Sequence, residues 1–181
     1  MKRFVFAGIF LGLVSTAHAA CPPAPDIIAD ETRLFAIAQA ADNRSEGQKI
    51  NRELWQLWAM APDEQAQALL DRGMTARSSF DFLAAIDAFD RLTKYCPNYA
   101  EGYNQRAFVN FLREDYNRAL IDLNLALELN PRHVAALSGK ALTLIRLGRN
   151  TEAQIVLREA VSLNPWIPER GLIVKPKGTD L

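Results

Sequence analysis

The chain has 181 residues, and its 21 basic and 21 acidic side chains balance to a net charge of zero. A chain of this length forms a single domain of ordinary size. The charge balance argues against nucleic-acid binding, which favours a basic excess. The sequence also has no cationic amphipathic helix, the feature that would indicate binding to a membrane surface.

The first twenty residues have the pattern of a secretory signal peptide. Lys2 begins a basic start, residues 4–14 form an apolar run, and small residues precede a cleavage point after Ala19 or Ala20. The apolar run is too short to cross a bilayer as a helix, which takes about 20 residues. We therefore expect residues 1–19 to be a signal peptide and the mature chain to be exported, most simply to a periplasm. A retained N-terminal anchor is the alternative.

Residues 20–30 form a proline-rich arm that begins beside one of the two cysteines, Cys21 and Cys96. An oxidising compartment allows these cysteines to pair, and the resulting disulfide would hold the arm along the domain. Closing a loop of this length stabilises the fold by about 4 kcal/mol in the chain-entropy model. A lipid on Cys21 is the competing interpretation, although the preceding residues lack the Leu of a lipobox.

Residues 31–62 predict a pair of helices with an irregular version of the pattern that follows. Apolar residues such as Leu34 and Leu57 fall where such a pair would bury them. Repeat arrays need atypical terminal units, so we expect this pair to cap the N-terminal end. Trp55 and Trp58 are expected to pack inside this cap, with ligand stacking as the alternative.

Three prolines, Pro97, Pro131 and Pro165, recur at intervals of 34 residues. Small residues keep the same interval where two helices would cross closely: Gly73, Ala107 and Ala141, and then Ala85, Ala119 and Ala153. A repeat of this length predicts stacked helix pairs. The predicted pairs occupy residues 66–99, 100–133 and 134–167.

A tail, residues 168–181, follows the third pair. We expect Trp166 and Ile167 to fold back over that pair.

The best repeat resembles a tetratricopeptide repeat (TPR). It runs from Ala100 to Pro131 and carries the residues on which the resemblance rests: Tyr103, Ala107, Tyr116, Ala119, Leu123 and Ala126. The resemblance implies an all-α fold, a right-handed superhelical stack of antiparallel helix pairs, and it extends to exported bacterial TPR-containing proteins. Phe80 departs from the pattern, because the family has Gly between the two helices.

Polar residues mark the expected starts of helices. Asp81, Asp115 and Asn150 are the predicted N-caps of the second helix in each pair. Asn98, followed three residues later by Glu101, resembles a capping box.

The sequence offers little for catalysis. His133 is the only histidine outside the predicted signal peptide, and we expect it on the surface at the start of a helix. One His and two separated Cys do not make a zinc site, and no nucleophile elbow or phosphate-binding glycine loop is present. We therefore predict no enzymatic activity, no cofactor and no metal. An enzyme built on carboxylates alone is a distant alternative.

Basic residues also recur at the repeat interval, at Arg72, Arg106 and Lys140. They form either a positive ladder for an acidic peptide or internal ion pairs. We favour the second, with Arg106 paired to Asp122, because a buried charge requires a partner.

The resemblance places a peptide-binding groove on the concave face, lined by the first helix of each pair. The candidate partner-binding residues are Leu70, Met74, Arg77, Glu101, Asn104, Gln105, Phe108, Phe111, Leu142 and Ile145. The places that hold a Lys, Asn and Arg clamp in chaperone-binding members carry Leu70, Met74, Gln105, Ala135 and Gly139 here. An apolar stripe therefore replaces that clamp and suits an apolar or amphipathic segment, unless the stripe is core or is covered by the chain's own tail.

We predict a scaffold that binds a protein or peptide within an envelope complex. A self-associating structural component, acting as a homo-oligomer, is the alternative.

Overall fold

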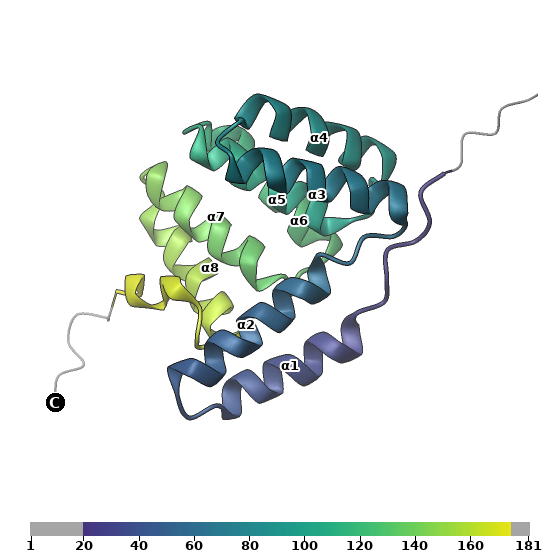
Figure 1. Cartoon of the computed structure of the whole chain (residues 1–181). Helices are drawn as coiled ribbons and strands as arrows, with labels where there is room; N and C mark the ends of the chain where they lie inside the picture. The colour runs from purple at the N-terminus through teal and green to yellow at the C-terminus, as the bar shows by residue number, and fades with distance from the viewer. Residues whose placement is uncertain (1–19, 175–181) are drawn as a thin grey trace, which may run out of the picture.

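The computed structural model describes residues 20–174, and the regular elements in this range are all helical (Figure 1). The predicted signal peptide lies outside the described residues. The elements are α1 (Ile28–Ala40), α2 (Arg44–Trp58), α3 (Glu64–Ser78), α4 (Phe82–Tyr95), α5 (Ala100–Leu112), α6 (Tyr116–Leu129), α7 (Val134–Arg146), α8 (Asn150–Leu163) and a short 3₁₀ helix, η1 (Pro168–Leu172). The all-α prediction is confirmed.

Helices α3 to α8 form three antiparallel pairs, and each pair packs on the next. The small residues that repeat every 34 positions lie at the closest crossings. A Cβ atom added to Gly73 would collide with the Phe89 ring, and Ala107 and Ala141 are buried at the equivalent places. Each of these positions therefore requires a small residue, because a larger side chain would push two helices apart.

The turns inside the three pairs share one unusual backbone conformation. Phe80, Glu114 and Gly148 have φ angles of 61°, 62° and 75°, and they are separated by the repeat interval. This left-handed conformation favours glycine, because a Cβ atom is strained there. The third turn has the glycine of the family pattern, whereas the other two carry strained residues.

The side chains of Asp81 and Asp115 cap α4 and α6, as predicted, by accepting hydrogen bonds from backbone amides of the first turn. The prediction for Asn150 is wrong, because this residue is the first of α8 and Arg149 precedes it. The repeat interval counted from Asp115 leads to Arg149, whose guanidinium pairs with Glu152 instead.

The prediction of a capping box at Asn98 is also wrong. Tyr99 is the residue before α5, and no side chain caps that helix. Glu101 is bound elsewhere, in a buried network described below.

The N-terminal pair is placed differently from the predicted end cap. Helices α1 and α2 share a core with the last repeat, α7 and α8, and Figure 1 shows α2 beside these helices and η1. Leu34, Leu54 and Trp58 meet Leu137 and Leu157 in this core. The apolar face of the N-terminal pair is therefore buried on the third pair, four helices further along the chain.

The segment after α8 reinforces this contact. The indole Nε1 of Trp166 donates to the carbonyl of Ala38 at 2.8 Å, and its ring lies so close to Gly47 that any side chain there would clash. Ile167 is buried with Leu157 of the last pair, as predicted. Trp166 was expected to fold over the last pair alone, but it packs between the last pair and the N-terminal pair.

The proline-rich arm ties the N-terminal pair to the first repeat as well. The predicted disulfide between Cys21 and Cys96 is present and fixes the arm to the end of α4. Nearby, the Tyr99 hydroxyl donates to the carbonyl of Trp58 at 2.7 Å. The N-terminal pair thus contacts both the first and the last repeat.

Among residues 20–174, none of the helices has the length and apolar character needed to span a membrane.

Candidate functional site

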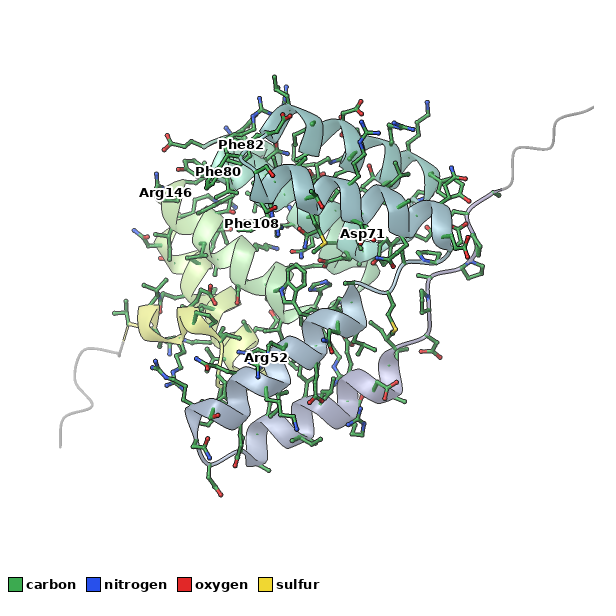
Figure 2. The ribbon with its side chains drawn as sticks, in the orientation of Figure 1. Arg52, Asp71, Phe80, Phe82, Phe108 and Arg146 are labelled. Atoms are coloured by element: carbon green, nitrogen blue, oxygen red, sulfur yellow. A yellow bond between two sulfur atoms is a disulfide. The ribbon has the colours of Figure 1, made fainter. Side chains whose placement is uncertain are left out.

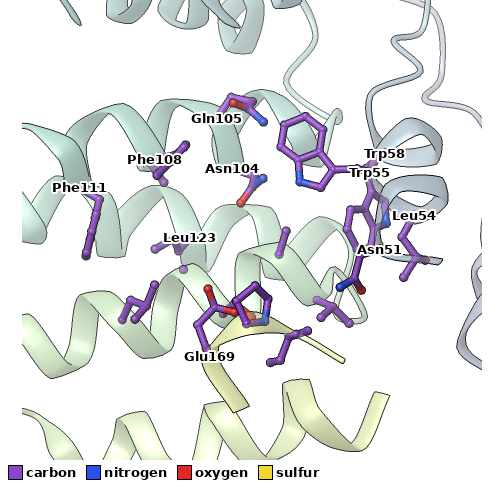
Figure 3. A pocket seen from close by; sticks show the side chains of 18 of the residues that line it. Asn51, Leu54, Trp55, Trp58, Asn104, Gln105, Phe108, Phe111, Leu123 and Glu169 are labelled. Atoms are coloured by element: carbon purple, nitrogen blue, oxygen red, sulfur yellow. The ribbon is translucent and has the colours of Figure 1, made fainter. Parts of the chain in front are cut away.

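The N-terminal pair converts part of the concave groove into a pocket. We call this the inner pocket; it has a volume of about 340 Å³ and lies between α2, α5, α7 and η1 (Figure 3). Helices α5 and α7, the first helices of the second and third pairs, form one side of the pocket. Helix α2 lies opposite them. The pocket therefore exists only because elements distant in sequence meet here.

Aromatic side chains form two of its walls. Trp55 and Trp58 project from α2, while Phe108 and Phe111 project from α5. Leu142 of α7 adds an aliphatic surface. This composition is typical of a pocket that binds apolar groups.

A few polar groups interrupt these apolar walls. Asn51, Asn104 and Gln105 contribute amides, and Glu169 of η1 contributes a carboxylate. Ser138 contributes a hydroxyl whose oxygen is buried without a hydrogen-bond partner among the described residues. The side chains that line the pocket in this part of the chain include no Lys or Arg.

A buried carboxylate, Glu101, organises the wall behind the pocket. It accepts hydrogen bonds from the Asn104 amide at 2.9 Å, from the Gln105 amide, and from His133 Nε2 at 2.8 Å. The Arg77 guanidinium in turn donates to Gln105. Burial lowers the pKa of Arg77, and the nearby charge of Glu101 opposes this change. The amides that face the pocket are therefore held in fixed orientations.

His133 is buried, with 1% of its surface exposed, so the prediction of a surface residue is wrong. Its Nδ1 caps α7 by accepting from the Ala136 amide, which leaves the proton on Nε2 to be donated to Glu101. Its ring stacks on Trp58 at a centroid distance of 4.2 Å. The N-terminal pair covers this histidine, and nothing in the local pattern of the repeat indicates that cover.

A second buried carboxylate binds Trp58 at its indole nitrogen. Glu31 of α1 accepts from the Trp58 indole at 2.6 Å and from the Asn130 amide at 2.8 Å. Burial also raises the pKa of the neighbouring Tyr99 phenol well above its usual value. Trp58 is therefore fixed on its ring face and at its indole nitrogen, which gives the inner pocket a rigid wall.

The rim of the groove carries charge next to aromatic rings. The Arg77 guanidinium lies 4.7 Å from the centre of the Phe108 ring, and Arg146 lies 5.0 Å from the centre of the Tyr116 ring. In the view of Figure 2, Phe108 lies between Arg146 and Asp71. Phe108 is 45% exposed, which makes it the predicted apolar residue most available to a partner at this rim.

Half of the predicted partner-binding residues meet at the inner pocket: Asn104, Gln105, Phe108, Phe111 and Leu142. The prediction of partner binding is wrong for two residues. Leu70 is fully buried in the core of the first pair, and Glu101 is enclosed by its hydrogen-bond partners. Met74, Arg77 and Ile145 do not line the pocket.

The contributions of α2 and η1 to the pocket were not predicted from the sequence. Trp55 and Trp58 were expected to pack inside the N-terminal pair, with ligand stacking as the alternative, and Glu169 was expected to belong to the tail. The signal that pointed to them was the pair of tryptophans in an otherwise polar helix.

Arg106 lies away from the pocket and forms the predicted internal pair. Its Nη2 and Nε donate to the two carboxylate oxygens of Asp122 at 2.6 and 2.9 Å, and its Nη1 donates to Asp90 and Thr93. Burial alone lowers the pKa of Arg106, but the hydrogen bonds and charges of the two aspartates raise it overall. The prediction of an internal ion pair is confirmed.

Among residues 20–174, no group of three or more His, Cys, Asp or Glu side chains has an arrangement that could hold a metal ion.

Comparisons with known proteins agree with the repeat. A family model described as tetratricopeptide repeat matches residues 134–165. A TPR repeat-containing protein of Rhizobium etli is 39% identical over 67 residues, which are 37% of this chain and 33% of that protein. Tetratricopeptide repeat protein 36 of Xenopus tropicalis is 32% identical over 132 residues, which are 70% of this chain and 64% of that protein. The chain thus spans about a third of the first relative and less than two thirds of the second.

Solved structures share the fold. The first TPR domain of Spaghetti (RPAP3), bound to the HSP90 peptide SRMEEVD, has a TM-score of 0.59 and 23% identity, covering 60% of this chain and 86% of that one. MamA has a TM-score of 0.54 and 20% identity, covering 67% and 71%. At these identities the likeness concerns the arrangement of helix pairs.

Proposed function

Because this chain belongs to the tetratricopeptide-repeat family, we propose that it is a non-enzymatic interaction scaffold. In this proposal, a segment of a partner protein lies across the concave groove and contacts the inner pocket. The observation that carries the proposal is the pocket itself, in which exposed Phe108 leads into an apolar cavity whose amides are already oriented. A site that is ordered before binding loses little entropy when a partner docks.

The proposal is supported by what related folds do. The RPAP3 domain named above was solved with a bound HSP90 peptide, so this arrangement of helices can present a peptide-binding face. Such an acidic peptide suits the pocket of this chain poorly, since the described lining has a carboxylate and no Lys or Arg. We therefore propose a partner segment that is apolar or amphipathic rather than one ending in a cluster of acids.

We also propose that the scaffold acts in the cell envelope, most simply in a bacterial periplasm. Two observations support this location: the basic and apolar pattern of the first twenty residues, and a disulfide that an oxidising compartment would maintain.

The test is site-specific photo-crosslinking in the native compartment, with the crosslinker at Phe111 of the groove. We expect Phe108→Glu to abolish the captured bands, because a charge would be placed at the apolar entrance. The matched control is Ile155→Glu on α8, a residue that is 64% exposed and does not line the pocket, and it should leave capture unchanged. Equal capture by the wild type and Phe108→Glu would contradict the proposal. Capture of a second copy of this chain would favour the self-associating alternative.

A further inference from the structure

The inner pocket has a more specific chemistry than a general apolar groove. We infer that it binds an uncharged aromatic group that carries one hydrogen-bonding atom, supplied by a small molecule or by a side chain. The inference deepens the proposed function, since the same pocket would receive part of the partner. It is tested by ligand binding alone, so either proposal can fail without the other.

The size and the walls of the inner pocket suit one aromatic group. A volume of about 340 Å³ falls at the lower end of the range for small-molecule sites, which is roughly 300–1,000 Å³. The indoles of Trp55 and Trp58 face the rings of Phe108 and Phe111 across this space (Figure 3). Aromatic walls favour an aromatic guest, because offset and edge contacts between rings add to the gain from burial.

The hydroxyl of Ser138 is unpaired in the described structure. Only 6% of this residue is exposed, and its Oγ has no hydrogen-bond partner among the described residues. Thr143, five residues further along the same helix, bonds its hydroxyl back to the carbonyl of Gly139 at 2.7 Å. Ser138 makes no such bond, although an unpaired buried hydroxyl costs free energy. A guest with one polar atom would satisfy it.

The charge of the pocket lining disfavours an anionic guest. Glu169 is the only charged side chain among the described residues that line the pocket, and it would repel an anion. An anionic guest would also lose its water without gaining a cationic partner. The guest is therefore uncharged, unlike the acidic peptide bound to the RPAP3 domain.

Isothermal titration calorimetry with two naphthalene probes tests the inference. We expect 2-naphthol to bind with a Kd on the order of 100 µM or tighter. Naphthalene-2-carboxylate, which has the same rings and a negative charge, should bind at least about tenfold more weakly. Absence of 2-naphthol binding, or equal affinity for the two probes, would overturn the inference.

Variants locate the site. Leu142→Trp should block binding by filling the pocket, and Ala135→Leu provides a second blocking variant if the first does not fold. Ser138→Ala should weaken 2-naphthol about fivefold, the effect of one neutral hydrogen bond. The control Ser162→Ala removes an exposed hydroxyl on α8 and should change nothing. Unchanged affinity in both blocking variants would place the probe elsewhere and refute the assignment.

A competition experiment identifies the source of the aromatic group. The peptide acetyl-Gly-Gly-Trp-Gly-Gly-amide carries one uncharged aromatic side chain on a backbone without charged termini. Displacement of 2-naphthol by this peptide would assign the pocket to a side chain of a partner. Binding of 2-naphthol without displacement would assign it to a free small molecule.

Discussion

Replacing Asp122 by alanine should lower the free energy of unfolding by about 3 kcal/mol, the lower end of the range for breaking a buried ion pair. Asp122 is 4% exposed and accepts two charge-assisted hydrogen bonds from Arg106, which link the two helices of the second pair. The expected loss stays at the lower end because Arg106 keeps its bonds to Asp90 and Thr93. Urea unfolding, followed by circular dichroism at 222 nm, measures this change.

A double-mutant cycle with Arg106→Ala separates the pair from its surroundings. We expect a coupling energy of about 2 kcal/mol, within the usual range for contacting residues. The matched control is the pair Arg149–Glu152, which has the same 2.6 Å distance between nitrogen and oxygen but lies on the surface. Its coupling should not exceed experimental error, because exposed pairs contribute little.

The dependence of the Arg106–Asp122 coupling on salt gives a second test of its burial. Raising the ionic strength should leave the coupling of the buried pair nearly unchanged, since salt screens exposed charges far more than buried ones. Asp122→Asn keeps the shape of the side chain and provides a milder variant if alanine prevents folding. A coupling below about 0.5 kcal/mol between Arg106 and Asp122 would refute the reasoning.

Three further predictions concern stability. Reducing the disulfide should lower the free energy of unfolding by about 4 kcal/mol, because the bond closes a long loop with a sequence separation of 75 residues; urea unfolding with and without reductant measures this loss. Glu114→Gly should raise stability by about 1 kcal/mol by relieving a left-handed backbone, and a lower midpoint in urea would contradict this. The pKa of Asp63 is lowered because the Tyr95 hydroxyl donates to it, so its stabilising effect is present above the unfolded pKa of about 3.8 and is lost as the pH falls through the lower folded pKa. The difference in stability between wild type and Asp63→Asn should therefore shrink as the pH falls from 6 towards 2, whereas a constant difference would exclude the titration.

The sequence predicted the local features of the repeats well, because each depends on neighbouring residues. Gly73 lies at a close crossing, and Asp81 and Asp115 cap their helices. The ion pair between Arg106 and Asp122 was also predictable, since both residues belong to the same helix pair.

The inner pocket was only half predictable. Phe108 and Leu142 follow from the family pattern, since they project from the first helices of their repeats. Trp58 and Glu169 reach the same pocket from opposite ends of the described chain, and no spacing in the sequence links them. His133 was misplaced for the same reason, because the cover over it comes from α2.

The packing of the N-terminal pair on the last described repeat also fixes how many helix pairs fit between them. An open solenoid gains or loses units at little cost, since each unit touches only its neighbours. Here an inserted or deleted pair would move α7 and α8 out of reach of α1 and α2, and it would separate Trp166 from Ala38. Residues 20–174 should therefore unfold as one cooperative body, and the spacing between α2 and α7 is set by the two helix pairs that lie between them.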